Sequence, residues 1–587
     1  MNPKTNSFQK LINDIKGLKR LWPFLRENKR YLIIAACLIP LISAAQSTMP
    51  LLIKWTIDNG IVAKNESNIW LGAGLGLGLI VFEYFTRAGQ TMYTALAVHR
   101  MIRNMRSYLV RHIMRLSASF HDRNLSGALV TRATSDFDNL SESLNQGVLN
   151  SIVDAAVLLG ALIGLFILNW QLALCALLIM PVVIVVVTQA SRLLKRTMLS
   201  ARSKIAALNG FTQECLYGST TIKLLAAEKH AQKKFDGLVI AYRNAQMKSV
   251  VIDASLFAVL DGISSITIGI ILWFAVSQIY GQDSGLSVGV MVAFVQYIQT
   301  LFEPLKQLGN KIAMLQGAFT SLDRIFKIID TNDFVEGDEL PKEIEGSIQA
   351  KNVSFRYDLE SSKPILDAVS FELKAGESLA LVGRTGSGKS TIIKLLSKLY
   401  GDFDGSIHLD GQDLRDLDGH ELRKKIAMVP QDIVLFDGSI LFNITLGHPN
   451  ISREDAINAS KLVGLHPIIE QLENDYDYKI SEEGVNLSQG QRQLIVFARA
   501  LAKDPKLIIL DEATSSVDPA SERLIQSAID RILHDRTVIV IAHRLSTIRS
   551  CDQIILLRQG KIQEKGNHES LMESGGQYFQ LYQALEG

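Results

Sequence analysis

Cysteine is scarce in this sequence, whose 587 residues include only Cys37, Cys175, Cys215 and Cys551. Their spacing fits neither a zinc site nor a redox pair, and unpaired thiols are typical of a protein in a reducing compartment. The sequence also lacks a strong net charge, since its formal charge at pH 7 is +2. Charge alone therefore neither indicates nor excludes nucleic acid binding.

No cleavable signal peptide is predicted, because the first thirty residues lack an apolar core segment. These residues are instead basic, and they carry apolar side chains such as Trp22 and Phe24 at a spacing that gives a helix one apolar face. We therefore predict a cytoplasmic interfacial helix within residues 1–30 that lies on the surface of the lipid bilayer. A solvated tail is the alternative.

What the sequence does contain is a series of long apolar runs, all before about residue 330. A chain of this length exceeds one hydrophobic core, so at least two domains are expected. Six of the runs are long enough to cross a membrane as helices. They are approximately Tyr31–Ile57, Ile69–Thr91, Val148–Leu168, Leu172–Ala190, Leu256–Tyr280 and Val288–Phe302.

Two basic segments predict the orientation of these spans. Residues 100–132 carry seven arginines and residues 192–248 carry eleven lysines or arginines, whereas the other three connections share a single lysine. Because basic loops remain cytoplasmic, both termini and the two long loops are predicted to be cytoplasmic.

The two long loops continue the helical periodicity of the spans on either side of them. We therefore expect spans two to five to extend into the cytoplasm as helices. The chain should turn near Arg115–Asp138 and near Phe211–Glu228.

Polar and ionisable side chains inside the spans need a physical reason, since a charge facing lipid is costly. Glu83 and Arg87 stand four residues apart in the second span and so share a helix face. Asp261 lies in the fifth span and Gln296 in the sixth. We predict that these four residues line a polar cavity; a structural Glu83–Arg87 pair that holds helices together is an equal alternative.

The C-terminal part contains a phosphate-loop pattern, G-x-x-x-x-G-K-[ST]. An apolar run typical of a buried strand precedes it, and a helical run follows it. Glycines let the backbone wrap around phosphates, and loop N–H groups at a helix N-terminus bind anions. The lysine is placed for the β- and γ-phosphates and the first hydroxyl for Mg²⁺. The residues are Gly383, Arg384, Thr385, Gly386, Ser387, Gly388, Lys389, Ser390 and the following Thr391.

Further residues for phosphoryl transfer follow along the chain. The apolar run 507–510 delivers Asp511 to the end of a predicted strand, where it can bind Mg²⁺ through water. Glu512 is then placed as the base that polarises the attacking water. His543 ends another apolar strand, where its side chain can reach a γ-phosphate. Two weaker signals are Tyr357, which can stack on a base, and Gln431, whose amide can face a metal or water.

The segment Ser488, Gln489 and Gly490 precedes a helical run that ends near Ala502. Ser488 and this helix N-terminus offer donors to an anion. Since the chain already has one phosphate loop, a second phosphate-facing helix fits a head-to-tail dimer in which each chain completes the other's nucleotide site.

These motifs, in this order, resemble those of an ATP-binding cassette (ABC) domain, and the whole chain resembles a half-size ABC exporter. The resemblance implies an α-helical transmembrane domain with six spans, followed by an α/β P-loop ATPase domain. The domains are expected as an interfacial helix at 1–30, a transmembrane domain at 31–330, a linker at 331–345 and a nucleotide-binding domain at 346–587. Segments around Phe120–Asp122 and Gly218–Lys223 are similar to the family's two coupling-helix regions.

The resemblance also implies cofactors and residue roles. ATP and Mg²⁺ are expected at a site with an adenine-stacking Tyr357, a metal-binding and coupling Gln431, a metal ligand at Asp511, a catalytic Glu512, a dimer-interface loop at Ser515–Asp518 and a switch histidine at His543. The usual family signature is L-S-G-G-Q, and Gln489 replaces its first glycine. This departure leaves both a homodimer and a heterodimer of half-transporters open.

The resulting prediction is an ATP-hydrolysing exporter in the inner (cytoplasmic) membrane that moves a small amphipathic substrate, drug-like or lipid, by alternating access. We expect no nucleic acid partner. An ATP-gated channel on the same scaffold is the main alternative. A soluble ABC ATPase of DNA repair or translation is disfavoured because six spans are fused to the ATPase part.

Overall fold

The computed structural model describes residues 20–280, 287–335, 337, 339–341, 343–357, 363–481, 484–511, 519–542 and 544–586. The chain forms two compact units, which we call the helical unit and the α/β unit. The helical unit comprises Met1–Met114 and Ser126–Thr331, and the α/β unit comprises Arg115–Leu125 and Asn332–Gly587. Most of the predicted N-terminal interfacial helix lies outside the described residues.

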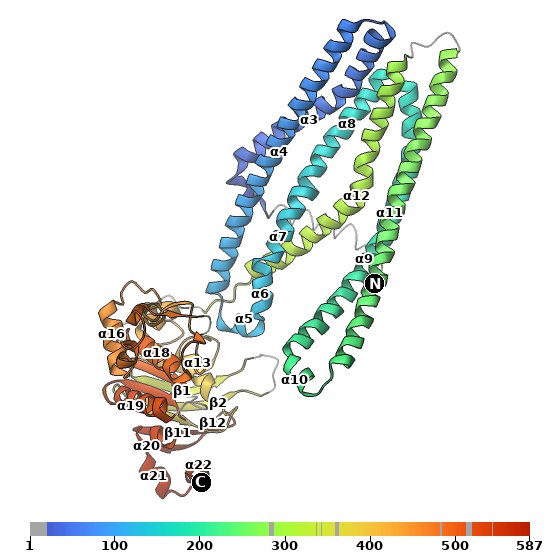
Figure 1. Ribbon diagram of the computed structural model, residues 1–587. Helices are drawn as coiled ribbons and strands as arrows, with labels where there is room; N and C mark the ends of the chain where they lie inside the picture. Colours follow the sequence, from blue (N-terminus) through green and yellow to red (C-terminus); the bar gives the residue numbers. More distant parts are fainter. Residues whose placement is uncertain are drawn as a thin grey trace. The chain divides into compact units, whose positions relative to one another are not determined.

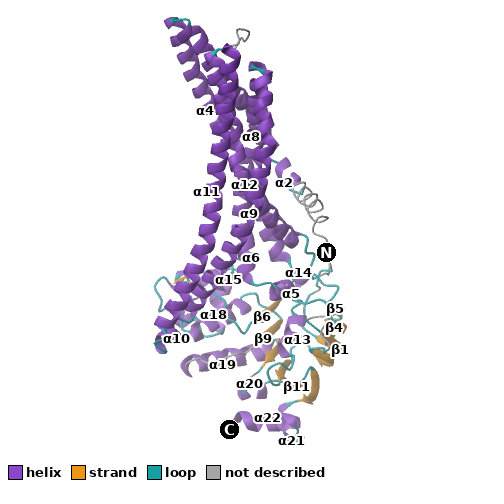
Figure 2. Ribbon diagram, turned by 90° about the vertical axis from the view of Figure 1, so that its right-hand side faces the viewer, coloured by secondary structure: helices purple, strands orange, loops and turns teal. Residues whose placement is uncertain are grey.

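The helical unit consists of long helices joined by short connections (Figures 1 and 2). They are α2 Trp22–Arg26, α3 Lys29–Thr56, the π-helix η1 Ile57–Val62, α4 Glu66–Arg115, α6 Ser126–Ala133, α7 Ser135–Glu142, the π-helix η2 Ser143–Leu149, α8 Asn150–Leu168, α9 Trp170–Tyr217, α10 Ser219–Leu224, α11 Glu228–Tyr280 and α12 Val288–Ile329.

Six helical segments of the described chain are long and apolar enough to cross a membrane, which confirms the six predicted spans. Less than half of each apolar window is buried inside the unit. Apolar surface on this scale is not left in contact with water, so lipid or another subunit must cover it. The chain is a multi-pass membrane protein.

Two long helices, α9 and α11, lie side by side (Figures 1 and 2). Asn169 begins α9, because its side chain accepts hydrogen bonds from the N–H groups of Gln171 (2.9 Å) and Leu172 (3.1 Å). Such a cap satisfies donors that have no partner inside the helix. The helix ends at Gly218, and the short α10 turns the chain into α11, within the predicted turning region.

The other predicted cytoplasmic extension is divided into short helices, and the breaks between them lie within the predicted turning region near Arg115–Asp138. Asn124 is extended (φ −120°, ψ 121°) and separates the short α5 from α6. Thr134, between α6 and α7, also has non-helical angles (φ −116°, ψ −86°). The π-helix η2 then connects α7 to α8. Each short segment between these breaks is itself a helix. The helical periodicity of the sequence is therefore found on both sides of each break.

A small residue allows α8 and α12 to pack closely inside the helical unit. Tyr297 of α12 is buried, and its hydroxyl donates a hydrogen bond to the carbonyl oxygen of Ser47. A Cβ at Gly164 of α8 would lie within 2.8 Å of the Tyr297 ring. Glycine is therefore required at position 164 for α8 and α12 to approach each other.

The described residues of the α/β unit form three sheets. Strands β2 Leu366–Leu373, β1 Ile348–Phe355, β4 Asp404–Leu409 and β5 Gln412–Asp413 form an antiparallel sheet in that order. The second sheet has the order β12 Lys561–Gly566, β11 Gln553–Arg558, β3 Ser378–Val382, β10 Thr537–Ile541, β9 Leu507–Asp511 and β6 Ile426–Val429. Strands β7 Gly438–Ser439 and β8 Lys479–Ile480 form a third, small sheet.

The helices of this unit are α5 Ala118–Arg123, α13 Lys389–Leu396, α14 Gly419–Lys425, α15 Ile440–Thr445, α16 Arg453–Leu462, α17 His466–Ile469, the 3-10 helix η3 Asp475–Asp477, α18 Gln489–Leu501, α19 Pro519–Asp535, α20 Leu545–Arg549, α21 His568–Glu573 and α22 Gln577–Glu586.

The central strands of the six-stranded sheet are buried on both faces. Alternate residues of β9 belong to two different cores: Ile508 and Leu510 pack with α18 and α19, and Leu507 and Ile509 pack with β1, β2 and α13. Strands covered on both sides read as continuous apolar runs rather than alternating ones. This burial explains the unbroken apolar stretches from which the sheet was predicted.

Candidate nucleotide site and membrane cavity

The ends of four parallel strands meet at one edge of the six-stranded sheet. Across the register, Leu381 of β3 pairs with Ile541 of β10, Ile541 pairs with Asp511 of β9, and Leu510 pairs with Val429 of β6. The phosphate loop follows β3, and Gln431 follows β6 on an exposed segment. Ligands of open α/β sheets bind outside the carboxyl ends of the strands. The fold therefore brings the predicted site segments to one edge.

The phosphate loop adopts a backbone that favours glycine. Gly383, Gly386 and Gly388 have positive φ angles of 153°, 80° and 105°. A Cβ at Gly388 would lie 2.7 Å from Leu366 Cδ2, and one at Gly383 would collide with the carbonyl oxygen of Leu557. Glycine is thus needed both for the angles and for the space. Helix α13 begins directly after the loop, so its N-terminal N–H groups point toward it.

Lys389 is the first residue of α13 and is only 7% exposed. Its ammonium donates hydrogen bonds to the carbonyl oxygens of Gly383 (2.6 Å) and Arg384 (3.3 Å), which are both in the loop. Burial lowers the pKa of Lys389, and the charge of Asp511 opposes this shift. The lysine is therefore held over the loop and within electrostatic range of the predicted metal ligand.

The loop fits a phosphate and a metal ion. The Ser387 hydroxyl is buried and has no hydrogen-bond partner among the described residues, which is unusual for a buried polar atom. Ser390, in the first turn of α13, is exposed and can offer its hydroxyl to a cation. Asp511 ends its strand half-buried beside them. Phosphate oxygens would fill the glycine-lined turn, and hydroxyl and carboxylate oxygens suit Mg²⁺.

Tyr357 lies in a cluster of aromatic rings. Its ring centroid is 5.0 Å from that of Phe355 and 5.2 Å from that of Tyr400, both edge to face. Its hydroxyl is 3.1 Å from the hydroxyl of Thr391, the third residue of α13. The side chain is 41% exposed. The cluster therefore fixes an aromatic surface close to the phosphate loop, as a base-stacking residue requires.

The same cluster binds α5. The ammonium of Lys394 lies 5.3 Å from the Tyr357 ring centroid and donates a 3.2 Å hydrogen bond to Asp122 of α5. The Tyr400 hydroxyl also donates to Asp122. The hydrogen bond from Tyr400 is the main reason that the pKa of Asp122 is lowered, and burial opposes it. One carboxylate thus joins α5 to two neighbours of the predicted adenine-stacking residue.

A second contact fixes the beginning of α5. Ser117 caps the helix by accepting a hydrogen bond from the N–H of Phe120 (3.2 Å), and its hydroxyl donates to Asp333 (2.8 Å). Arg123, at the other end of α5, forms an ion pair with the same Asp333 (2.6 Å). The segment predicted as a coupling helix is therefore packed as part of the α/β unit.

Glu512, the segment Ser515–Asp518 and His543 lie outside the described residues. In the chain, Glu512 directly follows Asp511, and His543 comes two residues after Ile541. Their predicted roles remain predictions from the sequence.

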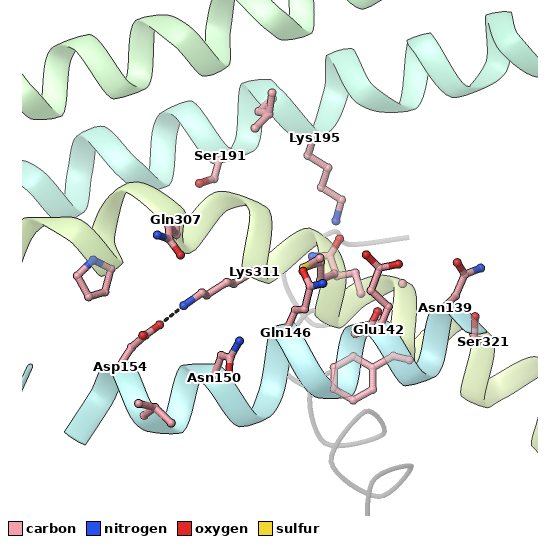
Figure 3. Close-up of a pocket in the computed structure, with 18 of the residues that line it drawn as sticks. Asn139, Glu142, Gln146, Asn150, Asp154, Ser191, Lys195, Gln307, Lys311 and Ser321 are labelled. Carbon is pink, nitrogen blue, oxygen red and sulfur yellow. Dashed lines mark hydrogen bonds and ion pairs between the residues drawn. The ribbon is translucent and has the colours of Figure 1, made fainter. Parts of the chain in front are cut away.

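The helical unit contains a large cavity of about 1840 Å³ (Figure 3). Its walls come from α7, η2, α8, α9 and α12, with α3 and α4 at one end. Its polar lining includes eight side-chain amides, namely Gln46, Gln90, Asn139, Gln146, Asn150, Gln299, Gln307 and Gln316. A cavity of this size and polarity can hold the polar part of an amphipathic molecule.

Comparison with known proteins divides the chain in the same way. Residues 32–305 match the family described as ABC transporter transmembrane region, and residues 366–515 match the ABC transporter family. An uncharacterized ABC transporter ATP-binding protein of Bacillus subtilis, YknV, is 34% identical over 576 residues, which cover 96% of this chain and 94% of that protein.

Two ATP-dependent lipid A-core flippases are also similar over nearly the whole chain. The protein of Haemophilus influenzae is 33% identical over 573 residues, covering 97% of each chain. The protein of Vibrio vulnificus strain CMCP6 is 32% identical over 575 residues, covering 97% of this chain and 98% of that protein. This chain belongs to the ABC transporter family. It is a half-size ABC exporter, and its α/β unit is an ATPase domain coupled to transport.

The signature segment of this ABC transporter begins α18. The Ser488 hydroxyl accepts a hydrogen bond from the N–H of Gln491 (3.2 Å), and the Gln491 side chain accepts one from the N–H of Ser488 (2.9 Å). This reciprocal pair is a capping box. Gln489 is the first helical residue. The backbone at position 489 therefore does not need a positive φ, and the replacement of glycine adds bulk without backbone strain.

The four predicted cavity residues of the ABC transporter occupy different places. Arg87 lines the cavity. Glu83 accepts hydrogen bonds from Gln46 (2.8 Å) and Arg87 (3.3 Å). Asp261 forms a 2.6 Å ion pair with Lys306. Glu83, Asp261 and Gln296 are not among the described residues that line the cavity.

One ion pair in the transporter's cavity was not predicted from the sequence. Lys311 of α12 binds Asp154 of α8 (Figure 3). A signal was present, because Asp154 is the one ionisable residue of the predicted third span. Its partner lies 157 positions away in the sequence, and no local pattern connects the two.

Proposed function

We propose that this ABC transporter uses ATP hydrolysis to move an amphipathic molecule out of the cytoplasm or the inner leaflet, by alternating access. The observation that carries this proposal is the presence, in one chain, of a glycine-lined phosphate loop held against Lys389 and a polar cavity in the helical unit that contains the six candidate spans. The named lipid A-core flippases, similar over the whole chain, support a lipid-like substrate, and a drug-like amphipath remains the alternative.

In this proposal two half-transporters form the active particle. Each phosphate loop binds ATP, Tyr357 stacks on the adenine, and Ser488 of the opposing chain completes the site. Mg²⁺, held by Ser390, Gln431 and, through water, Asp511, would neutralise charge on the phosphates. Closure of the two sites favours the outward-facing state of the cavity because that state binds ATP more tightly. Hydrolysis of ATP then returns the cavity to the inward-facing state.

The proposed location is the inner (cytoplasmic) membrane, with the N-terminus and the ATPase domain in the cytoplasm. The support is the concentration of basic residues in segments 100–132 and 192–248. In that orientation ATP reaches the ATPase domain directly.

Inverted membrane vesicles test the proposal. An exporter should accumulate a fluorescent amphipath inside such vesicles only when ATP and Mg²⁺ are added outside, and against a concentration gradient. ATP-dependent passage that only equalises the concentrations would indicate a channel and contradict a pump.

We expect this chain, expressed alone, to form a stable dimer with magnesium-dependent ATPase activity if a homodimer is the active particle. The chain carries Lys389, Asp511 and Ser488, and capping of α18 tolerates Gln489 without strain, so a homodimer is chemically sufficient. Size-exclusion chromatography and phosphate release are the measurements. A folded but inactive chain that regains activity on co-expression with a second half-transporter would establish the heterodimer instead.

We expect single cysteines at positions 83, 87 and 261 to react with a membrane-impermeant thiol reagent when no nucleotide is added. The cost of exposing charge to lipid predicts an aqueous surface at these positions. Labelling of inverted vesicles, with the native cysteines replaced, measures this accessibility. Protection of all three positions would instead favour buried structural pairs.

A further inference from the structure

The charges that line the cavity of the helical unit are balanced in number. Among the described residues of the lining, the five cationic ones are Arg87, Lys195, Arg202, Lys311 and Arg324, and the five anionic ones are Asp136, Glu142, Asp154, Glu303 and Asp323. A cavity with equal numbers of both signs has no strong overall preference for an anion or a cation. Its selectivity must therefore come from the positions of individual charges.

Most of these charges already have partners. Lys311 binds Asp154, Arg324 binds Asp136 at 3.4 Å, and Arg87 binds Glu83 at 3.3 Å. Glu303, a further residue of the cavity lining, forms an ion pair with Lys306 at 3.4 Å. A substrate that used these groups would first have to break an existing ion pair.

Four charged residues of the lining form no ion pair or side-chain hydrogen bond with another described residue. They are Lys195, Arg202, Glu142 and Asp323. Both cations belong to α9, and they are seven residues apart, so they share a helix face about 10 Å apart along the axis. The anions come from other walls, Glu142 from α7 and Asp323 from α12.

Figure 3 shows how these walls face each other. Lys195 points from α9 into the cavity, toward the side that carries Glu142 and Gln146. The lining amides come from the other walls, whereas α9 contributes the hydroxyl of Ser191 beside Lys195; amides and hydroxyls can both accept or donate hydrogen bonds around a charge. The unpartnered cations and anions therefore lie on separate walls of one polar cavity.

We propose that this cavity binds an amphipath whose headgroup carries both signs of charge, with its anionic group at Lys195 and Arg202 and its cationic group at Glu142 and Asp323. The inference rests on the proposed export function and names its substrate class. A purely anionic headgroup would leave the two carboxylates facing its negative charge, and a purely cationic one would leave the two cations unpaired. Only a zwitterion matches both walls.

Stimulation of ATPase activity by soluble single-chain amphipaths tests this inference. The full-length dimer is purified in the non-ionic detergent dodecyl maltoside, so that no charged lipid competes. The zwitterionic probe is lysophosphatidylethanolamine. Its N-acetyl derivative keeps only the phosphate charge, and dodecylamine keeps only the amine charge. We expect half-maximal stimulation by the zwitterion at a concentration about tenfold lower than by either single-charge probe.

Two substitutions should weaken this preference, one by removing a carboxylate that faces the amine and the other by removing a cation that faces the phosphate. Glu142→Gln should reduce the advantage of lysophosphatidylethanolamine over its N-acetyl derivative, because one of the two carboxylate partners of the amine is lost. Lys195→Gln should reduce the advantage of the zwitterion over dodecylamine. The matched controls are Asp138→Asn on α7 and Arg196→Gln on α9, neither of which lines the cavity. Both controls should keep the wild-type order of probes.

The outcomes separate this inference from the proposed function. Equal stimulation by the three probes, or a stronger response to a single-charge probe, overturns the zwitterion assignment while ATP-driven uptake into inverted vesicles still supports an exporter. Wild-type ratios between the half-maximal concentrations of the three probes in both Glu142→Gln and Lys195→Gln overturn it as well. Absence of both stimulation and vesicle uptake would overturn export and substrate class together.

Discussion

Replacing Glu512 by glutamine is expected to reduce ATP turnover by about 100-fold or more while ATP binding is retained. Glu512 directly follows Asp511, which ends β9 at the edge where the phosphate loop also begins. A carboxylate there can polarise the attacking water, whereas the amide keeps the shape and loses the charge. The measurements are phosphate release and equilibrium titration with ATP.

The matched control is Glu573→Gln, which removes a carboxylate from α21, away from the loop. This variant should hydrolyse ATP at the wild-type rate. A Glu512→Gln variant that hydrolysed ATP as fast as the control would mean that another group activates the water.

Lys389→Ala is expected to weaken ATP binding by about 10- to 100-fold, in addition to slowing hydrolysis. Charge-assisted hydrogen bonds contribute about 1.5–3 kcal/mol each, and one tenfold change in affinity corresponds to about 1.4 kcal/mol. The ammonium is already directed over the loop by the carbonyls of Gly383 and Arg384, so little reorganisation is needed for it to meet a phosphate. Titration with a fluorescent ATP analogue measures the affinity.

Thermal unfolding should accompany this titration, because the alanine also leaves two loop carbonyls without their donor. Lys424→Ala, at an exposed surface ion pair with Glu421, serves as the control, since such pairs contribute little to stability. Unchanged ATP affinity in a folded Lys389→Ala protein would contradict the placement of this lysine at the phosphates.

The fold class was predictable because membrane spans and buried parallel strands both leave continuous apolar runs. The run that ends at Asp511 is an example, since β9 is covered on both faces and its last residue alone is polar. The phosphate loop was predictable for a different reason: the positive φ angles at Gly383, Gly386 and Gly388 restrict those positions to one residue type. Each of these features is determined by residues that lie close together in the sequence.

Features that depend on distant partners were not predictable in the same way. The hydrogen bonds from Lys394 and Tyr400 to Asp122 join residues more than 270 positions apart, and each residue alone resembles an ordinary surface group. The Lys311–Asp154 ion pair likewise joins two residues that are far apart in the sequence. The breaks between α5, α6 and α7 lie within the predicted turning region, but the apolar periodicity does not locate them at Asn124 and Thr134, where the backbone angles are non-helical.

The packing of α5 bears on how this protein can be divided. A fragment that began at Asn332 would contain every strand of the ATPase domain, yet it would lack residues 115–125, which fold with that domain. Asp333 would lose both Ser117 and Arg123, and the Lys394 and Tyr400 side chains would lose their shared carboxylate. The ATPase domain is therefore discontinuous in sequence, and a cut at the linker would remove a piece of its own surface next to neighbours of Tyr357, the predicted adenine-stacking residue.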